Sequence, residues 1–115
     1  MPSVINLSEI PYFDGHCDTI WRCMYGEPAA CGLRENNGHL DLLRSGRYGR
    51  RAQFFALFDN AATLPSGPVW PHLCAMHRWF REQLAANGDM AVLCRTGGEV
   101  DDAVSAGRTA ALLSI

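Results

Sequence analysis

His16 and Asp18 are the residues whose types and spacing could do chemistry, and they stand two positions apart near the N-terminus. We expect residues 11–18 to form a strand that runs into a loop. Because side chains alternate across a strand, Asp14, His16 and Asp18 would share one face. An imidazole nitrogen and a carboxylate oxygen are both zinc ligands. The spacing therefore makes His16 and Asp18 candidate ligands of one metal ion, with Asp14 placed behind them to orient a ligand or to hold an interior salt bridge.

The spacing alone has an alternative interpretation, because a histidine and an aspartate two residues apart are common by chance. The alternative is a histidine at a strand end that is hydrogen-bonded to a nearby aspartate. Cys17 would point to the opposite face, so we interpret it as a core residue and not as a nucleophile. The other histidines are not expected to be ligands: His39 is a turn residue, and His72 and His77 belong to a helix.

Alternating strands and helices are expected to position these residues. The clearest strand, residues 51–58, is apolar on both faces apart from Gln53, which is typical of a parallel sheet. The other expected elements are a short helix near residues 20–24, a helical turn from Asn37 or Gly38 to Gly46, a helix over 69–87 that buries a stripe beginning at Val69, a strand over 90–94, a capped helix over 96–106 and a strand over 109–115. Such alternation predicts an α/β fold. An open doubly wound sheet and the N-terminal part of a (β/α)8 TIM-type barrel both fit, and 115 residues would supply about four β/α units of the roughly 250-residue barrel.

Composition is that of an ordinary globular protein: 48% hydrophobic residues and a net charge of -2. No apolar run approaches the roughly 18 residues that cross a bilayer, and no secretory signal is apparent, so we expect a cytoplasmic protein without a membrane partner. The only basic cluster comprises Arg44, Arg47, Arg50 and Arg51. We interpret it as a solvated loop and expect no nucleic-acid partner. The five cysteines form no C-x-x-C pair and are expected to be free thiols.

Four segments, taken in order, carry a resemblance to a known family. They are residues 13–21 with the motif Asp14-Gly15-His16-Cys17-Asp18, residues 38–46, residues 49–58 and residues 107–115. These resemble the opening strand, the segment before the second strand, the second strand and the approach to a later strand of the membrane (renal) dipeptidase family, zinc metallopeptidases with an amidohydrolase-type barrel. The resemblance covers residues 11–115.

The resemblance implies a zinc-dependent dipeptidase that hydrolyses small dipeptides. In the family, the residues that match His16 and Asp18 bind one of two zinc ions. The bridging glutamate, the ligands of the second zinc and the catalytic aspartate belong to later strands, so no catalytic residue is expected within this chain and all are expected after Ile115. Residues 1–115 are therefore interpreted as the N-terminal portion of a single barrel domain, truncated at its C-terminus. Whether the complete enzyme forms a homodimer stays open.

Two alternatives remain. Another amidohydrolase-like metal hydrolase would act on esters, lactones or nucleic-acid ends. Many of those enzymes begin with two histidines, so Asp18 at the second position favours the dipeptidase. The other alternative is a non-catalytic fragment, because His16 and Asp18 are fewer than the three protein ligands of a typical catalytic zinc.

Overall fold

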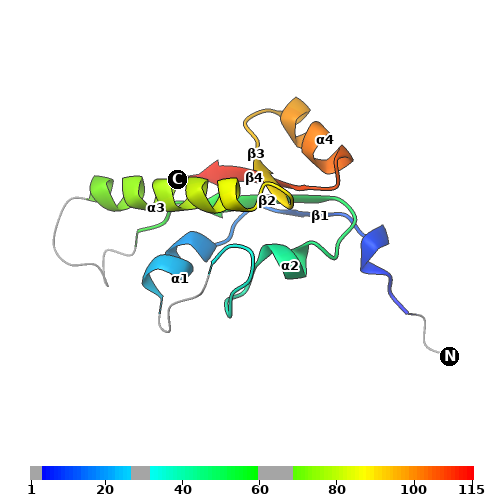
Figure 1. Ribbon diagram of the computed structural model, residues 1–115, viewed down its shortest axis with the longest axis horizontal. Coiled ribbons are helices and arrows are strands. Elements are labelled where there is room, and N and C mark those ends of the chain that lie inside the picture. Colours follow the sequence, from blue (N-terminus) through cyan, green and yellow to red (C-terminus); the bar gives the residue numbers. More distant parts are fainter. Residues whose placement is uncertain (1–3, 27–31, 60–68) are drawn as a thin grey trace.

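The computed structural model describes residues 4–26, 32–59 and 69–115, which form a parallel four-stranded sheet with helices on both faces (Figure 1). In chain order the elements are a 3-10 turn η1 (Leu7–Glu9), β1 (Tyr12–Asp14), α1 (Thr19–Tyr25), α2 (Leu42–Ser45), β2 (Arg51–Ala56), α3 (Val69–Ala86), β3 (Ala91–Leu93), α4 (Gly97–Ser105) and β4 (Thr109–Ser114). The predicted alternation is confirmed, and the fold is α/β. None of the helices in the described part of the chain combines the length and hydropathy needed to cross a bilayer.

The strands lie in the order β1-β2-β4-β3, so the last two do not follow chain order. β2 and β4 pair over five positions, from Ala52 opposite Ala110 to Ala56 opposite Ser114. β3 pairs with β4 over three positions only. The two six-residue apolar strands are thus neighbours, and the shorter β3 lies at the edge of the sheet. This order differs from the sequential one expected of four consecutive β/α units of a barrel.

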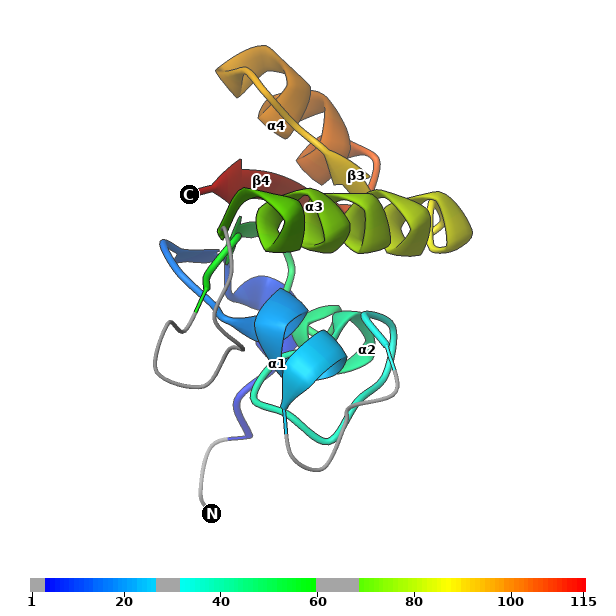
Figure 2. The same cartoon turned by 90° about the vertical axis from the view of Figure 1, so that its left-hand side faces the viewer.

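Helices cover both faces of the sheet because adjacent residues of a strand point in opposite directions. Ala111 of β4 belongs to one core cluster, together with Phe55 of β2 and Phe80 of α3. Its neighbour Ala110 belongs to a second cluster, together with Ala103 of α4. Figure 2 shows α1, α2 and α3 on one side of the sheet and α4 on the other. The side chains of Phe55 and Ala111 therefore face α3, while that of Ala110 faces α4.

α3 packs on β2 through residues spaced four apart. Met76, Phe80 and Leu84 are all buried, and the ring centroids of Phe55 and Phe80 are 4.9 Å apart. The predicted start near residue 69 and end before Asn87 are confirmed. The prediction that Val69 begins the buried stripe is wrong, because Val69 is 46% exposed in the first turn.

β1 is shorter than predicted, and it ends at Asp14 instead of continuing to Asp18. The Asp14 carboxylate accepts a hydrogen bond from the backbone amide of His16 at 3.3 Å. This bond turns the chain away from β2 within two residues, because a side chain that satisfies a nearby backbone amide replaces a strand pairing. Contact with β2 resumes once, where the Ala56 amide donates to the Cys17 carbonyl at 3.0 Å.

α2 begins later than the predicted start at Asn37 or Gly38, while the predicted end at Gly46 is confirmed. Asp41 occupies the N-cap, and its carboxylate accepts from the Arg44 amide at 2.8 Å. Asn36 holds the preceding loop by donating to the carbonyls of Gly32 and Leu40 at 2.8 and 2.9 Å. The loop therefore takes the place of the first predicted helical turn.

The basic cluster is only partly the solvated loop that the sequence predicted. Arg51 is buried and donates to Thr109 Oγ1 at 2.9 Å and to the Gly107 carbonyl at 2.6 Å. Arg44 forms an ion pair with buried Asp41 at 2.8 Å. Arg47 and Arg50 are exposed, as expected. Two of the four arginines thus hold the fold together.

Candidate metal site

Asp14 is fixed by the sheet. It lies opposite Gln53 in the register of β1 and β2, and Gln53 Nε2 donates to Asp14 Oδ2 at 2.8 Å. Gln53 is fully buried and also donates to the Phe54 carbonyl at 3.0 Å. The other carboxylate oxygen of Asp14 receives the His16 amide. Asp14 therefore holds the backbone of His16 in place, and with it the point from which the imidazole side chain extends.

His16 and Asp18 face each other across the loop between β1 and α1. Nε2 of His16 lies 3.0 Å from Oδ1 of Asp18, and the two side chains are 62% and 47% exposed. Asp18 occupies the N-cap of α1, where an aspartate usually accepts from the helix amides, yet its side chain makes no capping bond. The carboxylate is instead directed to the imidazole. An imidazole nitrogen and a carboxylate oxygen, both atom types that can bind zinc, thus lie close together at the protein surface.

The same 3.0 Å contact is also the hydrogen bond of the alternative interpretation of these two residues. Both interpretations share one geometry, because a pair that can hydrogen-bond through Nε2 and Oδ1 presents the same atoms to a cation. A measurement of metal binding distinguishes the two interpretations.

Cys17 lies on the core side of the loop, as predicted. It is partly buried and packs against the cluster that contains Ile20 and Phe55. Burial raises the pKa of the Cys17 thiol, and the neighbouring carboxylates of Asp14 and Asp18 act in the same direction, so the thiol stays protonated at neutral pH. A nucleophilic role is therefore disfavoured. No disulfide joins the cysteines of the described ranges, which are Cys17, Cys23, Cys74 and Cys94; Cys31 lies outside those ranges.

A hollow of about 490 Å³ adjoins the pair. Its walls come from the loop after β1, from α1, from the loop before α2 and from the residue Phe58 beyond β2. The lining residues are Asp14, His16, Cys17, Asp18, Thr19, Trp21, Arg22, Asn36, Gly38, His39, Leu40 and Phe58. No local pattern indicated that His39 would border the same hollow as His16. Its position depends on the loop that Asn36 holds in place.

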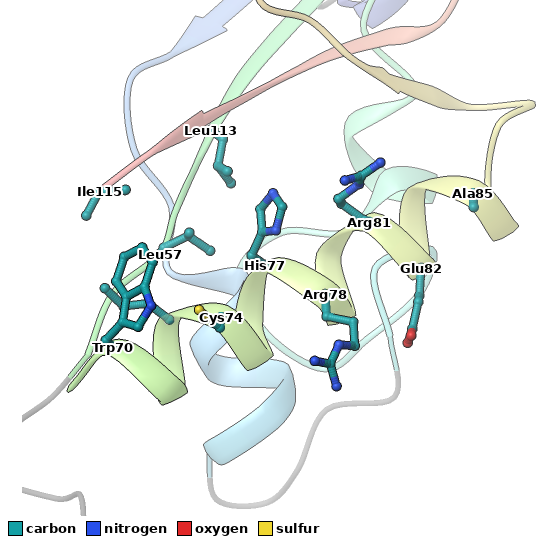
Figure 3. A pocket seen from close by; sticks show the side chains of 11 residues that line it. Leu57, Trp70, Cys74, His77, Arg78, Arg81, Glu82, Ala85, Leu113 and Ile115 are labelled. Carbon is teal, nitrogen blue, oxygen red and sulfur yellow. The ribbon is translucent and has the colours of Figure 1, made fainter. Parts of the chain in front are cut away.

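A larger hollow, about 870 Å³, lies along α3 and the end of β4 (Figure 3). Leu57, Trp70 and Leu113 give it an apolar floor, and His77 and Arg81 point toward it from α3. It shares no lining residue with the hollow beside His16. This larger hollow is therefore separate from the candidate metal ligands His16 and Asp18.

The remaining histidines do not complete a metal centre. The ring of His72 packs edge-on against Tyr25, with centroids 6.1 Å apart, and His77 borders the groove along α3. Within residues 4–26, 32–59 and 69–115 no three histidine, cysteine or acidic side chains are grouped so that they could hold a metal ion. His16 and Asp18 are therefore two candidate ligands, and no third candidate is grouped with them among the described residues.

The comparisons with known proteins support the fold. No family model matches the sequence, and no curated protein matches it. A solved structure described as dipeptidase AC, a metallopeptidase of family M19, is 25% identical to this chain, with a TM-score of 0.59. The match covers 90% of this chain and 34% of that one, so the chain spans about a third of that dipeptidase. The chain therefore has the α/β fold of part of a metallopeptidase barrel, and its kinship to the dipeptidases is supported at the level of the fold.

Proposed function

We propose that this chain is the N-terminal portion of a zinc-dependent dipeptidase, and that His16 and Asp18 bind one of its metal ions. The observation that carries the proposal is the orientation of Asp18. Its carboxylate leaves the helix cap and lies 3.0 Å from His16 Nε2, at the end of the first strand of a parallel sheet. The catalytic groups of α/β barrels lie at this end of their strands. The similarity to a solved metallopeptidase supports the same conclusion.

The chemistry that zinc would supply is a bound water with its pKa lowered to about 7 and a polarised carbonyl. The residues of this chain would hold the zinc ion. His16 Nε2 and Asp18 Oδ1 are the two ligating atoms, and Asp14, held by Gln53, fixes the backbone amide of His16. Asp18 at the second ligand position favours a dipeptidase over other amidohydrolase-like hydrolases. Dipeptide hydrolysis belongs to the complete enzyme, so we expect the 115-residue chain alone to hydrolyse no dipeptide.

Zinc binding by the chain itself tests the ligand assignment. We expect one zinc ion to bind weakly, with a dissociation constant of micromolar or above, because two ligands fall short of a full set. His16→Ala and Asp18→Asn should each weaken zinc binding at least about tenfold, which corresponds to about 1.4 kcal/mol. The measurement is calorimetric titration with zinc at neutral pH, together with metal analysis after dialysis.

His77→Ala is the matched control, because it also removes one imidazole but lies on α3 beside the other groove. It should leave zinc binding unchanged. Equal zinc binding by His16→Ala and the unmodified chain would refute the ligand assignment and leave the plain hydrogen bond as the better interpretation.

A further inference from the structure

One stripe of α3 carries side chains that the proposed metal site does not use. Trp70, Cys74, His77 and Arg81 are spaced three or four residues apart, so they lie on one side of the helix. All four border the hollow of about 870 Å³ along α3 and the end of β4, which we call the α3 groove. Its volume is within the range of roughly 300–1,000 Å³ found for small-molecule sites. One stripe of a helix therefore lines a space large enough for a small ligand.

The α3 groove is apolar at the end where the helix begins. Trp70 lies in the first turn of α3 and is 68% exposed. Leu57, one residue beyond β2, and Leu113 of β4 line the groove from the sheet (Figure 3). Apolar surface that is open to water favours an apolar occupant, because burial removes that surface from water. This end of the groove therefore suits a hydrocarbon chain.

The other end of the groove is basic. Arg81 borders the α3 groove and two adjoining hollows of about 500 and 380 Å³, and Arg95 borders both of the latter. In the part of the chain that the structure describes, neither guanidinium group forms an ion pair or a hydrogen bond. The carboxylate of Glu99, which borders the smaller hollow, accepts from the Arg95 backbone amide. Two guanidinium groups thus face one carboxylate, which leaves an excess of one positive charge.

The remaining charged side chains of the groove offset each other. Arg78 and Glu82 are four residues apart on α3, a spacing at which opposite charges attract. Both extend away from Leu113, whereas His77 and Arg81 extend toward the β4 side of the helix (Figure 3). His77 also offers a ring N–H group, which donates a hydrogen bond in either neutral tautomer. The excess positive charge therefore lies beside His77, where one anionic group is favoured.

The spacing along α3 sets the length of a ligand that reaches both ends of the groove. Trp70 and His77 are seven residues apart, which is roughly 10 Å along the helix axis. A guanidinium group matches the planar carboxylate with two parallel hydrogen bonds. A phosphate monoester carries close to two negative charges at neutral pH, which exceeds the single positive charge available.

We propose that the α3 groove binds a small monocarboxylate with an apolar tail of medium length. The carboxylate lies at His77 and Arg81, and the tail runs along the apolar floor toward Trp70. Arg95 adds a second positive charge beyond Arg81. The candidate metal ligands take no part, so this binding site goes beyond the proposed function and does not depend on it.

NMR titration of the 115-residue chain with octanoate, 1-octanol and acetate separates the contributions of charge and tail. The protein concentration is kept where sedimentation shows a monomer. We expect octanoate to bind at least about fivefold more tightly than 1-octanol, because only octanoate pairs with the guanidinium group. Acetate should not saturate the site where octanoate does, because it has no tail to bury. The resonances of Leu57, Leu113 and Trp70 should shift with octanoate.

Arg81→Gln tests the basic end of the groove. It should reduce the preference for octanoate over 1-octanol to less than about twofold, and Arg81→Lys should restore part of it, since lysine keeps the charge without the planar donor group. Arg78→Gln is the matched control, because Arg78 borders the same groove on the same helix but extends away from Leu113. It should leave the preference intact.

Trp70→Ser tests the apolar end. It should weaken octanoate and 1-octanol alike by at least about threefold, because both lose the same apolar contact. Val69→Ser is its control: Val69 is also exposed in the first turn (46%) but does not border the groove. Thermal melts confirm that the variants fold.

Four outcomes would each overturn the proposed site. They are no detectable binding of octanoate, binding of 1-octanol or acetate as tight as that of octanoate, an equal loss of preference in Arg78→Gln and Arg81→Gln, and octanoate-induced shifts confined to residues outside the groove. Shifts of the groove residues that grow with protein concentration in the absence of any ligand would show a second copy of the chain in the groove, and would also overturn it.

Discussion

Single carboxylates in this chain have roles that depend on their hydrogen bonds more than on their type. Asp14 accepts from a side chain and a backbone amide, and both bonds hold the turn that follows β1. Asp18 stands at a helix cap but leaves it for His16. Asp41 stands at another helix cap and stays there. Of these three carboxylates, that of Asp18 alone faces an imidazole.

Asp41 gives a prediction about stability and pH. Burial by itself would raise the pKa of the Asp41 carboxyl, but hydrogen bonds from the amides of Arg44 and Asn36, with the Arg44 guanidinium, outweigh it and lower the pKa below its usual value. A lowered pKa in the folded state stabilises the fold above the unfolded pKa of about 3.9, and this stabilisation is lost as the pH falls through the folded value. Asp41→Asn should therefore cost about 1–3 kcal/mol at pH 7 and lose less further stability between pH 5 and pH 3 than the unmodified chain.

Urea unfolding at pH 7, 5 and 3 measures both effects. Asp89→Asn is the control, because Asp89 is 61% exposed in a surface ion pair with Arg34 and should change stability by less than about 1 kcal/mol. The same pH dependence in Asp41→Asn and the unmodified chain would contradict the assignment.

At the scale of the elements, the sequence predicted the helices and helix ends that depend on local residue patterns. The spacing of Met76, Phe80 and Leu84 predicted α3, and Thr96 with Glu99 predicted the start of α4, where Thr96 Oγ1 accepts from the Glu99 amide at 3.1 Å. The early end of β1 was missed because it depends on one side-chain bond from Asp14 to the backbone. The sheet order β1-β2-β4-β3 is not predictable from local patterns, because tertiary packing decides which strands become neighbours.

The site follows the same division. His16 and Asp18 were predictable because their types and spacing lie within one loop. The positions of His39 and Phe58 beside them were not predictable, because separate segments of the chain bring these residues to the hollow. Arg51 was misinterpreted for a related reason: its partners Thr109 and Gly107 are more than fifty residues away in sequence.

Arg51 therefore gives a prediction at the scale of the elements. Its guanidinium joins the start of β2 to the start of β4 and also donates to the Tyr48 carbonyl at 2.7 Å. Lysine keeps the charge but lacks the planar group with five donors. Arg51→Lys should lower the free energy of unfolding by about 2 kcal/mol or more, since buried hydrogen bonds from a charged group are lost. Denaturant unfolding measures this loss, and exposed Arg50→Lys, the control, should change stability by less than about 0.5 kcal/mol. Equal effects of the two substitutions would show that the network contributes nothing.

At the scale of the whole molecule, apolar surface remains open on the sheet. Phe13 is 70% exposed on β1, and its ring packs edge-on against Phe54 with centroids 5.7 Å apart. Among the described residues β1 pairs only with β2, so its other edge presents free backbone groups. An open strand edge beside exposed aromatic rings is a template for association.

We therefore expect the 115-residue chain to self-associate through β1 as its concentration rises. Phe13→Ser should shift it toward the monomer, because the substitution removes the largest apolar side chain at that edge while leaving the backbone pairing with Ala52 in place. Sedimentation velocity and light scattering over a range of concentrations measure the shift. Ile5→Ser is the control: Ile5 is 72% exposed but precedes the sheet, so replacing it should leave association nearly unchanged. A chain that stays monomeric at every concentration would refute the predicted self-association, and an equal effect of the two substitutions would place the association elsewhere than the β1 edge.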